Sequence, residues 1–200
     1  MEFVDRSLIH RYHQERIQMY GEGTTSALGW KEEQSQQSRF EILAQIGDMN
    51  DLSILDAGCG HGDLRSFLGK KYPSIRYAGI DQMEEFLDVA TARYGNMPDT
   101  TFYLGDCWTA ELPNMDFVLA CGLLAYRNSK PDFIYRIIDK LFASSRLGLG
   151  FNLLKNVNDP EGILVNYDPQ EIITYCKKLT PKVVLREGYA VDDFTIFMYQ

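Results

Sequence analysis

Three glycines at alternate positions, Gly58, Gly60 and Gly62, follow a short apolar run that contains Asp56. Glycine allows the backbone to adopt positive φ and allows a ligand to approach the main chain closely. A helical pattern begins at Asp63, so the N–H groups of its first turn would point back at this loop. The stretch predicts a ligand cradle at the carboxyl end of a first strand, where open α/β sheets bind ligands.

Carboxylates beside the loop favour a cationic ligand over a dinucleotide. The dinucleotide pattern G-x-G-x-x-G would need glycine at position 63, where Asp63 stands. Asp56 would oppose a pyrophosphate and would attract a cationic group such as a sulfonium or an ammonium. The alternative interpretation is a tight strand-to-helix turn that binds nothing.

Two further carboxylates stand where the next predicted strands end. Asp81 lies 19 residues after Gly62, close to the position whose acidic side chain bonds ribose hydroxyls in nucleotide-binding α/β folds. Asp106 follows the third predicted strand, where a carboxylate can accept a hydrogen bond from the amino group of adenine. Taken alone, either Asp could be a helix cap or a turn residue. Three consecutive predicted strands thus each end with a carboxylate suited to bind a ligand, and together they indicate one nucleoside-like ligand.

The run from Leu55 to Gly62 resembles the first motif of the class I S-adenosylmethionine-dependent methyltransferases, and the region of Asp81 resembles the second. The resemblance covers roughly residues 51–200. It implies S-adenosylmethionine as cofactor and S-adenosylhomocysteine as product. The sequence shows no cluster of metal-ligand residues, so we expect no metal. Trp30, before this region, could stack on the ligand or simply hold its helix to the core. The expected cofactor-binding residues are Asp56, Gly58, Cys59, Gly60, Gly62, Asp81, Gln82, Met83, Asp106, Cys107, Trp108, Cys121, Tyr20 and Trp30.

The candidates for the transfer step are fewer. Methyl transfer needs a base only if the acceptor must lose a proton. His10 and His13 stand three residues apart on the first predicted helix and could supply one, although a solvated polar face is the alternative. Asn152, at the end of the fifth predicted strand, could orient an acceptor. We therefore expect transfer of a methyl group to an O or N of a small molecule. The alternative is a non-catalytic protein that binds S-adenosylmethionine as a sensor or partner subunit. A nucleotide-dependent oxidoreductase is a weaker alternative, because Asp56 and Asp63 flank the loop.

Composition restricts the partners and the compartment. The 200 residues carry a net charge of −8, which argues against a broad nucleic-acid-binding surface, because that affinity depends on Lys and Arg. Residues 120–126 also lack the Asn/Asp-Pro-Pro-Tyr/Phe run of methyltransferases that act on nucleic-acid bases. No apolar run is long enough for a membrane span, and residues 1–6 do not resemble a secretory signal. Four scattered cysteines, without a C-x-x-C pair, favour free thiols in the cytoplasm. We expect a monomer or a homodimer.

The elements that must position these residues follow from the alternation of strands and helices after residue 52. This alternation predicts an α/β fold with a doubly wound, mostly parallel sheet. No helix separates the last two strands, so they are predicted to be antiparallel. With the resemblance, this gives seven strands with an antiparallel last strand, plus N-terminal helices. The expected strands are 53–57, 75–80, 101–104, 117–120, 147–153, 182–186 and 195–199, and the expected helices 5–20, 31–48, 63–72, 84–94, 131 onward and 170–179.

Residues 1–50 precede this alternating region. Their two predicted helices are joined by a stretch rich in Gly, Thr and Ser, residues 21–29, which could act as a hinge. We expect residues 1–50 to form a helical lid and substrate segment over a methyltransferase domain of residues 51–200, within a single domain overall.

Overall fold

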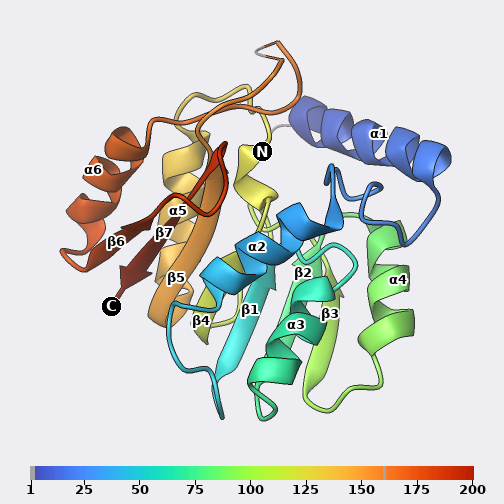
Figure 1. Cartoon of the computed structure of the whole chain (residues 1–200), viewed down its shortest axis with the longest axis horizontal. Helices are drawn as coiled ribbons and strands as arrows, with labels where there is room; N and C mark the ends of the chain where they lie inside the picture. Colours follow the sequence, from blue (N-terminus) through green and yellow to red (C-terminus); the bar gives the residue numbers. More distant parts are fainter. Residues whose placement is uncertain (1–2, 160) are drawn as a thin grey trace.

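A seven-stranded sheet organises the computed structural model, which describes residues 3–159 and 161–200, Phe3 by its backbone alone. The strand order is β3-β2-β1-β4-β5-β7-β6; β1 to β5 are parallel, and β7 is antiparallel to both of its neighbours (Figure 1). The predicted seven strands and reversed last strand are confirmed. The strands are β1 (Ser53–Ala57), β2 (Arg76–Asp81), β3 (Thr100–Leu104), β4 (Met115–Ala120), β5 (Ser145–Leu154), β6 (Val183–Arg186) and β7 (Asp193–Tyr199).

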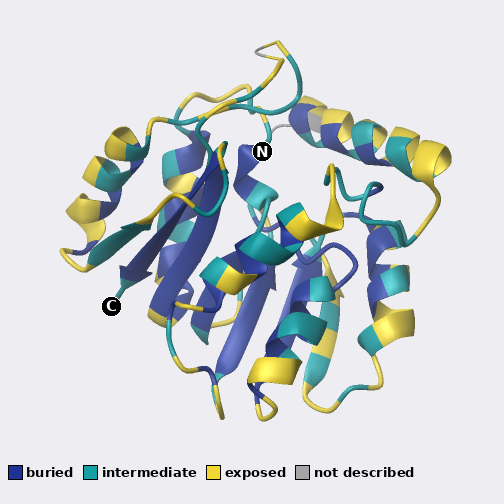
Figure 2. Cartoon of the chain, viewed as in Figure 1, coloured by how far each residue is buried: buried dark blue, intermediate teal, exposed yellow. Residues whose placement is uncertain are grey.

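Helices cover both faces of this sheet. Helices α2 and α3 lie on one face and α5 and α6 on the other, while α4 packs at the β2–β3 edge (Figure 1). Because the central strands are covered on both sides, every residue of β1 is buried, as Figure 2 shows. The helices are α1 (Phe3–Tyr20), α2 (Glu33–Leu43), α3 (Asp63–Lys71), α4 (Glu84–Tyr94), α5 (Phe133–Ala143) and α6 (Pro169–Leu179), with a short 3₁₀ helix η1 (Leu123–Ala125) after β4.

Two predicted helix boundaries were wrong. Helix α5 begins at Phe133, because Pro131 lies in a turn that the Phe133 N–H closes by donating to the Lys130 carbonyl, 3.1 Å away. Helix α2 ends at Leu43 rather than near Asp48, because the next hydrogen bonds, such as that from Ile46 N–H to the Leu43 carbonyl, span three residues.

Helix α1 lies across the carboxyl ends of the parallel strands (Figure 1). Its buried face consists of Asp5, Ile9 and His13, at a spacing of four residues. The Asp5 carboxylate accepts hydrogen bonds from the N–H and hydroxyl of Ser129, at 3.0 and 2.8 Å. Helix α1 is therefore tied by specific contacts to the segment that follows η1.

Two sequence expectations concern the membrane and the chain start. None of the helices within the described ranges is both long and apolar enough to cross a bilayer. The start of the chain, where we expect no secretory signal, lies partly outside the described residues.

Candidate functional site

A cavity at the carboxyl edge of the sheet, hereafter the strand-end cavity, collects most of the predicted site residues. It is walled by the loops after β1, β2, β3 and β4, by α1 and by residues 28–30, and about 100 Å³ within it is free. The predicted residues that line it are His13, Trp30, Asp56, Gly58, Cys59, Gly60, Asp81, Gln82, Met83, Asp106, Cys107 and Cys121.

The glycine loop forms one wall of this cavity, and two leucines pack onto it. Gly58 and Gly60 have φ of 73° and 52°, in the left-handed region. A Cβ at Gly58 would lie 2.8 Å from Leu123 Cδ1, and one at Gly60 would lie 2.8 Å from Leu28 Cδ2. Both glycines therefore permit a close approach to the main chain, which Leu28 and Leu123 now make.

The second wall offers hydrogen-bond acceptors. One oxygen of Asp81 accepts the Gly60 N–H and the other accepts the Met83 N–H, each at 2.9 Å. Each carboxylate oxygen has two lone pairs, so each can still accept a hydroxyl. The side-chain oxygen of Gln82 is buried and has no hydrogen-bond partner among the described residues. This wall therefore suits a ligand rich in hydroxyl and amino donors.

Asp56 lies beneath the glycine loop with 1% of its surface exposed. Burial raises the pKa of this carboxyl to about 7, against the opposing effect of a hydrogen bond from the Tyr77 hydroxyl and with the help of nearby Asp81. Both the protonated and the ionised form of Asp56 are therefore accessible near neutral pH. A cation in the cavity would shift it toward the carboxylate, whereas the sequence pattern alone suggested a fixed negative charge.

Other predicted cofactor contacts have a second role or lie elsewhere. Asp106 accepts the Trp108 N–H at 2.8 Å, so it is a turn residue and also lines the cavity. Trp108 packs against Phe133 and does not line the cavity. Gly62 caps α3 outside the lining, and Tyr20 is 45% exposed on α1.

The two histidines of α1 occupy different places. His10 lies at a surface depression beside Arg6 and Arg11. His13 lines the strand-end cavity; its Nδ1 lies 3.2 Å from the Ala27 carbonyl oxygen and its Nε2 lies 2.8 Å from the Tyr126 hydroxyl. Burial lowers the pKa of His13 to about 4, against the opposing effect of the Ala27 hydrogen bond, so the ring is neutral near pH 7.

A second cavity, hereafter the outer cavity, adjoins the first and has about 500 Å³ of free space. Its wall combines aliphatic side chains with the amide of Asn152 and parts of the segments 154–164 and 190–192. Four residues line both cavities: Leu28, Trp30, Gly122 and Tyr126. A group bound in one cavity would therefore meet a group bound in the other along this shared wall.

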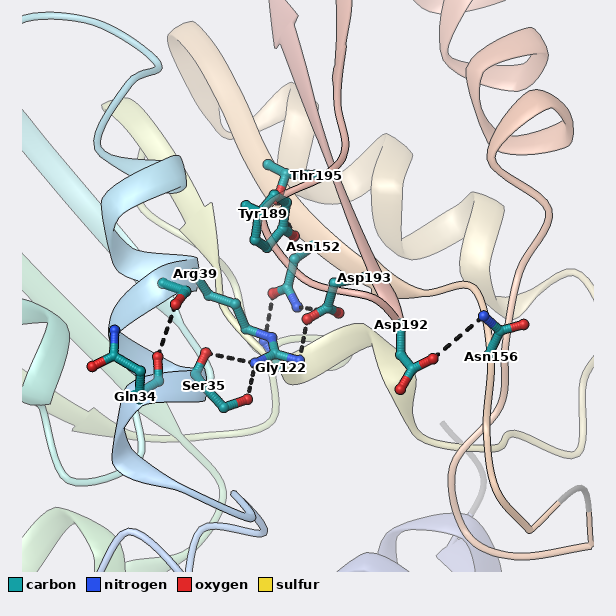
Figure 3. A network of polar contacts seen from close by, with 11 residues as sticks. Gln34, Ser35, Arg39, Gly122, Asn152, Asn156, Tyr189, Asp192, Asp193 and Thr195 are labelled. Carbon is teal, nitrogen blue, oxygen red and sulfur yellow. Dashed lines mark hydrogen bonds and ion pairs between the residues drawn. The ribbon is translucent and has the colours of Figure 1, made fainter.

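A network of contacts holds the shared wall in place (Figure 3). The Asn152 side chain accepts the Gly122 N–H at 2.8 Å and donates to Asp193 at 3.4 Å. Asp193 forms a buried ion pair with Arg39, whose guanidinium lies 4.7 Å from the Trp30 ring centroid. Trp30 in turn packs against Gly122, where a Cβ would lie 3.0 Å from the ring. The oxygen and the nitrogen of the Asn152 amide are thus both engaged in positioning the wall.

Several residues of the two cavities were not among the sequence candidates. Gln36 and Phe86 line the strand-end cavity, and Leu28, Gly122 and Tyr126 line both cavities. No local motif marks them, because their partners lie far along the chain. Among the described residues, no group of His, Cys, Asp and Glu is arranged to hold a metal ion.

Comparisons with known proteins agree with this geometry. A family model described as a methyltransferase domain matches residues 54–142, which contain the glycine loop and the first four strands. Rv1506c of Mycobacterium tuberculosis (strain H37Rv), whose name assigns it as a putative methyltransferase, is 30% identical over 162 residues, covering 76% of this chain and 96% of that protein. Trans-aconitate 2-methyltransferase of M. tuberculosis (strain H37Ra) is 26% identical over 106 residues, covering 53% of this chain and 39% of that enzyme.

Solved structures share the fold over nearly the whole chain. Magnesium protoporphyrin IX methyltransferase from Synechocystis PCC 6803, with bound S-adenosylhomocysteine, superposes with a TM-score of 0.74 at 15% identity, covering 98% of this chain and 99% of that one. The N-methyltransferase NodS from Bradyrhizobium japonicum WM9, also with S-adenosylhomocysteine, gives 0.70 at 15% identity over 95% and 97%. With the sheet order, the glycine loop and the sequence match to Rv1506c, this likeness identifies the chain as a methyltransferase of the class I, S-adenosylmethionine-dependent family.

Proposed function

We propose that the protein transfers a methyl group from S-adenosylmethionine to an oxygen or nitrogen of a small molecule, with the cofactor in the strand-end cavity and the acceptor in the outer cavity. The observation that carries this proposal is the wall of Leu28, Trp30, Gly122 and Tyr126 that the two cavities share. Transfer requires that the two reacting groups be held in contact, and this wall is where ligands of the two cavities would meet.

The residues of the strand-end cavity suit this cofactor. Asp81 has lone pairs left for ribose hydroxyls, and Gln82 and Asp106 offer acceptors for an amino group. Asp56 supplies a carboxyl that becomes fully ionised beside a cationic group. When bound, S-adenosylmethionine supplies a methyl group already activated by its positively charged sulfur. The chain's own tasks are to bind, to orient and to exclude water.

The outer cavity and the charge of the chain favour a small acceptor. Its free space of about 500 Å³ lies within the range of small-molecule pockets. The net charge of −8 disfavours nucleic acid. Relatives in the same family carry the names of small-molecule acceptors, trans-aconitate and magnesium protoporphyrin IX. We further propose a cytoplasmic monomer or homodimer that needs no metal.

Residues 1–50 form a lid in this proposal. Leu28 and Leu123 leave about 100 Å³ free in the strand-end cavity, less than the roughly 300 Å³ or more of typical ligand pockets. A nucleoside-sized ligand therefore enters only if these leucines move away from Gly58 and Gly60. Leu28 lies in the segment that joins α1 to α2, so opening of this segment would admit the cofactor.

The test of the proposed function is turnover. The protein is incubated with methyl-labelled S-adenosylmethionine and a metabolite extract of its source cells, and label in small molecules is measured together with S-adenosylhomocysteine. We expect both products in equal amounts. Binding of S-adenosylmethionine without any transfer would instead support the sensor or partner subunit, and preferential binding of NAD would support the oxidoreductase.

A further inference from the structure

Tyr126 and His13 form a hydrogen-bonded pair at the junction of the two cavities. Tyr126 follows η1 and lines both cavities, and His13 reaches the strand-end cavity from α1. The Tyr126 hydroxyl and His13 Nε2 are 2.8 Å apart, and His13 Nδ1 is 3.2 Å from the Ala27 carbonyl oxygen. Both ring nitrogens of His13 therefore have a partner.

These partners fix the direction of the hydrogen bonds. The Ala27 carbonyl can only accept, so His13 Nδ1 carries the hydrogen. In a neutral imidazole Nε2 is then bare, so the Tyr126 hydroxyl must donate to it. The Tyr126 oxygen has given away its only hydrogen and presents lone pairs alone to any further partner.

Burial first, and then the charged groups around the pair, keep His13 neutral at rest. Arg16 and His10, both on α1, oppose a positive charge on His13, and no carboxylate is hydrogen-bonded to its ring in the part of the chain that the structure describes. Burial opposes a tyrosinate at Tyr126 most strongly, Tyr12 and Asp81 oppose it as well, and Arg16 favours it. The resting pair is therefore a neutral phenol that donates to a neutral imidazole.

We propose that Tyr126 is a catalytic residue and that the methyl acceptor is an atom that carries a hydrogen, in a hydroxyl or an amine, rather than a carboxylate oxygen. The inference rests on the proposed function and deepens it. The Tyr126 oxygen, which has only lone pairs to offer, can accept a hydrogen bond from an O–H or N–H group. A carboxylate has no hydrogen, so its lone pairs would face the lone pairs of the Tyr126 oxygen.

The step balances without any further reactant. The acceptor's electron pair forms the new bond to the methyl carbon, and the pair of the broken carbon–sulfur bond returns to sulfur, which becomes neutral. The acceptor's proton passes to the Tyr126 oxygen while the Tyr126 proton passes to His13 Nε2. The positive charge thus moves from sulfur to His13, which leaves the net charge of the cavities unchanged, and it is then released to solvent as a proton. His13 acts through Tyr126 and is a positioning residue.

A purely structural role is the alternative, because His13 also packs edge-on against Tyr12 and Phe86, with ring centroids 5.0 Å away in each case. The variant Tyr126→Phe keeps the ring and removes only the oxygen. The variant Tyr135→Phe is the matched control, since it also removes one hydroxyl, which donates to Glu171 on α6 and lies in neither cavity. We expect both variants to bind S-adenosylhomocysteine as the wild type does, by calorimetry.

The chemical stability of the labelled product tests the acceptor class. Methyl esters release their label as methanol in mild alkali, whereas methyl ethers and methylamines keep it. With methyl-labelled S-adenosylmethionine and the cell extract, we expect alkali-stable product, and we expect Tyr126→Phe to lower the rate by about 10²- to 10⁴-fold, as loss of proton transfer does. Alkali-labile label, or an unchanged rate in Tyr126→Phe, would overturn the inference. Transfer to no component by the wild type would instead reject the proposed function itself.

A measurement on the resting wild-type protein covers the case in which Tyr126→Phe does not fold. Nitrogen NMR of the ring nitrogens distinguishes protonated from bare nitrogen, and the signals of His13 are assigned with His13→Gln. We expect hydrogen on Nδ1 and none on Nε2 at neutral pH. Hydrogen on Nε2 would overturn the inference, because the Tyr126 oxygen would then be the acceptor in this pair.

Discussion

The strand-end cavity, the proposed cofactor side, and the outer cavity, the proposed acceptor side, are built in different ways. On the cofactor side, the key contacts join residues close in sequence: the Gly60 N–H to Asp81 and the Tyr77 hydroxyl to Asp56 each span 21 residues. On the acceptor side they join distant parts of the chain, since Arg39, which lines the outer cavity, pairs with Asp193, 154 residues later. The first arrangement follows from one β-α-β unit, whereas the second exists only after the whole chain has folded.

This difference predicts different consequences of mutation. The cofactor side uses main-chain geometry and carboxyls at strand ends, so its changes should appear in ligand affinity and in pH dependence. The acceptor side depends on a buried ion pair, Arg39 with Asp193, that joins α2 to β7. Its changes should appear first in the stability of the fold.

The largest expected effect is loss of this ion pair. Burial raises the pKa of Asp193 despite the opposing effect of Arg39, so the intact pair contributes little net stability to the fold. Removing one partner is costly, because it leaves the other as an uncompensated buried charge. We expect Asp193→Ala to lower the free energy of unfolding by about 3–5 kcal/mol in urea titrations. Arg136→Ala, which breaks the exposed pair with Asp132, should change it by about 0.5 kcal/mol at most. Equal losses in the two variants would show that the acceptor side does not depend on the network.

The second effect is a pH dependence set by Asp56. Its pKa is about 7 in the folded protein, against an ordinary value of 3.8 for an aspartic acid, so between these pH values the folded state holds a proton that the unfolded state has released. Stability from this group therefore falls as pH rises from about 4 to 7. His13 and His61, the latter in the glycine loop between Gly60 and Gly62, have pKa values that burial lowers to about 4. They act in the opposite direction up to about pH 6.5.

The variant Asp56→Asn isolates the carboxyl from the histidines. The free energy of unfolding of this variant minus that of the wild type should rise by roughly 2–4 kcal/mol as the pH increases from about 4 to 8. The reason is that each unit of pKa shift corresponds to about 1.4 kcal/mol. Urea titrations across this range measure the difference. A difference that stays flat with pH would mean that Asp56 is ionised throughout.

Replacing glycines by alanine should have a smaller effect on stability, and a comparison of Gly58 with Gly21 separates side-chain crowding from backbone strain. Gly58 and Gly21 both have positive φ, but a Cβ would meet Leu123 only at Gly58, and it would meet nothing within 4 Å at Gly21. Gly21→Ala should cost about 1–2 kcal/mol from the backbone alone. Gly58→Ala should cost more and should also weaken binding of S-adenosylhomocysteine. Equal costs and unchanged binding in both variants would place Gly58 outside the cradle.

The smallest expected effect is local: movement of the proposed lid should change hydrogen exchange in one segment and leave the overall stability of the fold nearly unchanged. Hydrogen exchange should be fast for amides of residues 5–30 in the free protein and should slow markedly when S-adenosylhomocysteine is added, while the amides of β1 stay protected in both states. Equal protection of residues 5–30 in both states would make the segment fixed structure and would leave the cofactor no route past Leu28.

The sequence predicted the residues that line the strand-end cavity far better than those that line the outer cavity, for a physical reason. The bounds of β1 and α4 agree with the sequence expectation. Helix α6 begins one residue before its expected start at 170, and Asp168 caps it by accepting the N–H groups of two residues in the first turn. These features depend on local caps and glycines. The partners of Tyr126 and Arg39 are set by packing between α1, α2, β5 and β7, which no local pattern encodes.

The alternatives left open for single residues resolve in the same way. Asp106 is both a turn residue and part of the cavity wall, and Trp30 both packs under Arg39 and lines the two cavities. A residue type and its position could suggest each role, but only the folded neighbours show that the two roles coincide.

Calorimetric titration of the wild type and Asp81→Ala with S-adenosylhomocysteine tests the central claim most directly. The claim is that the strand ends bind the adenosine part of the cofactor, with Asp81 accepting from its hydroxyls. We expect binding by the wild type and a loss of about 1–3 kcal/mol in Asp81→Ala, the cost of removing hydrogen bonds to a charged group. The same affinity in both proteins, or no binding by the wild type, would contradict the account.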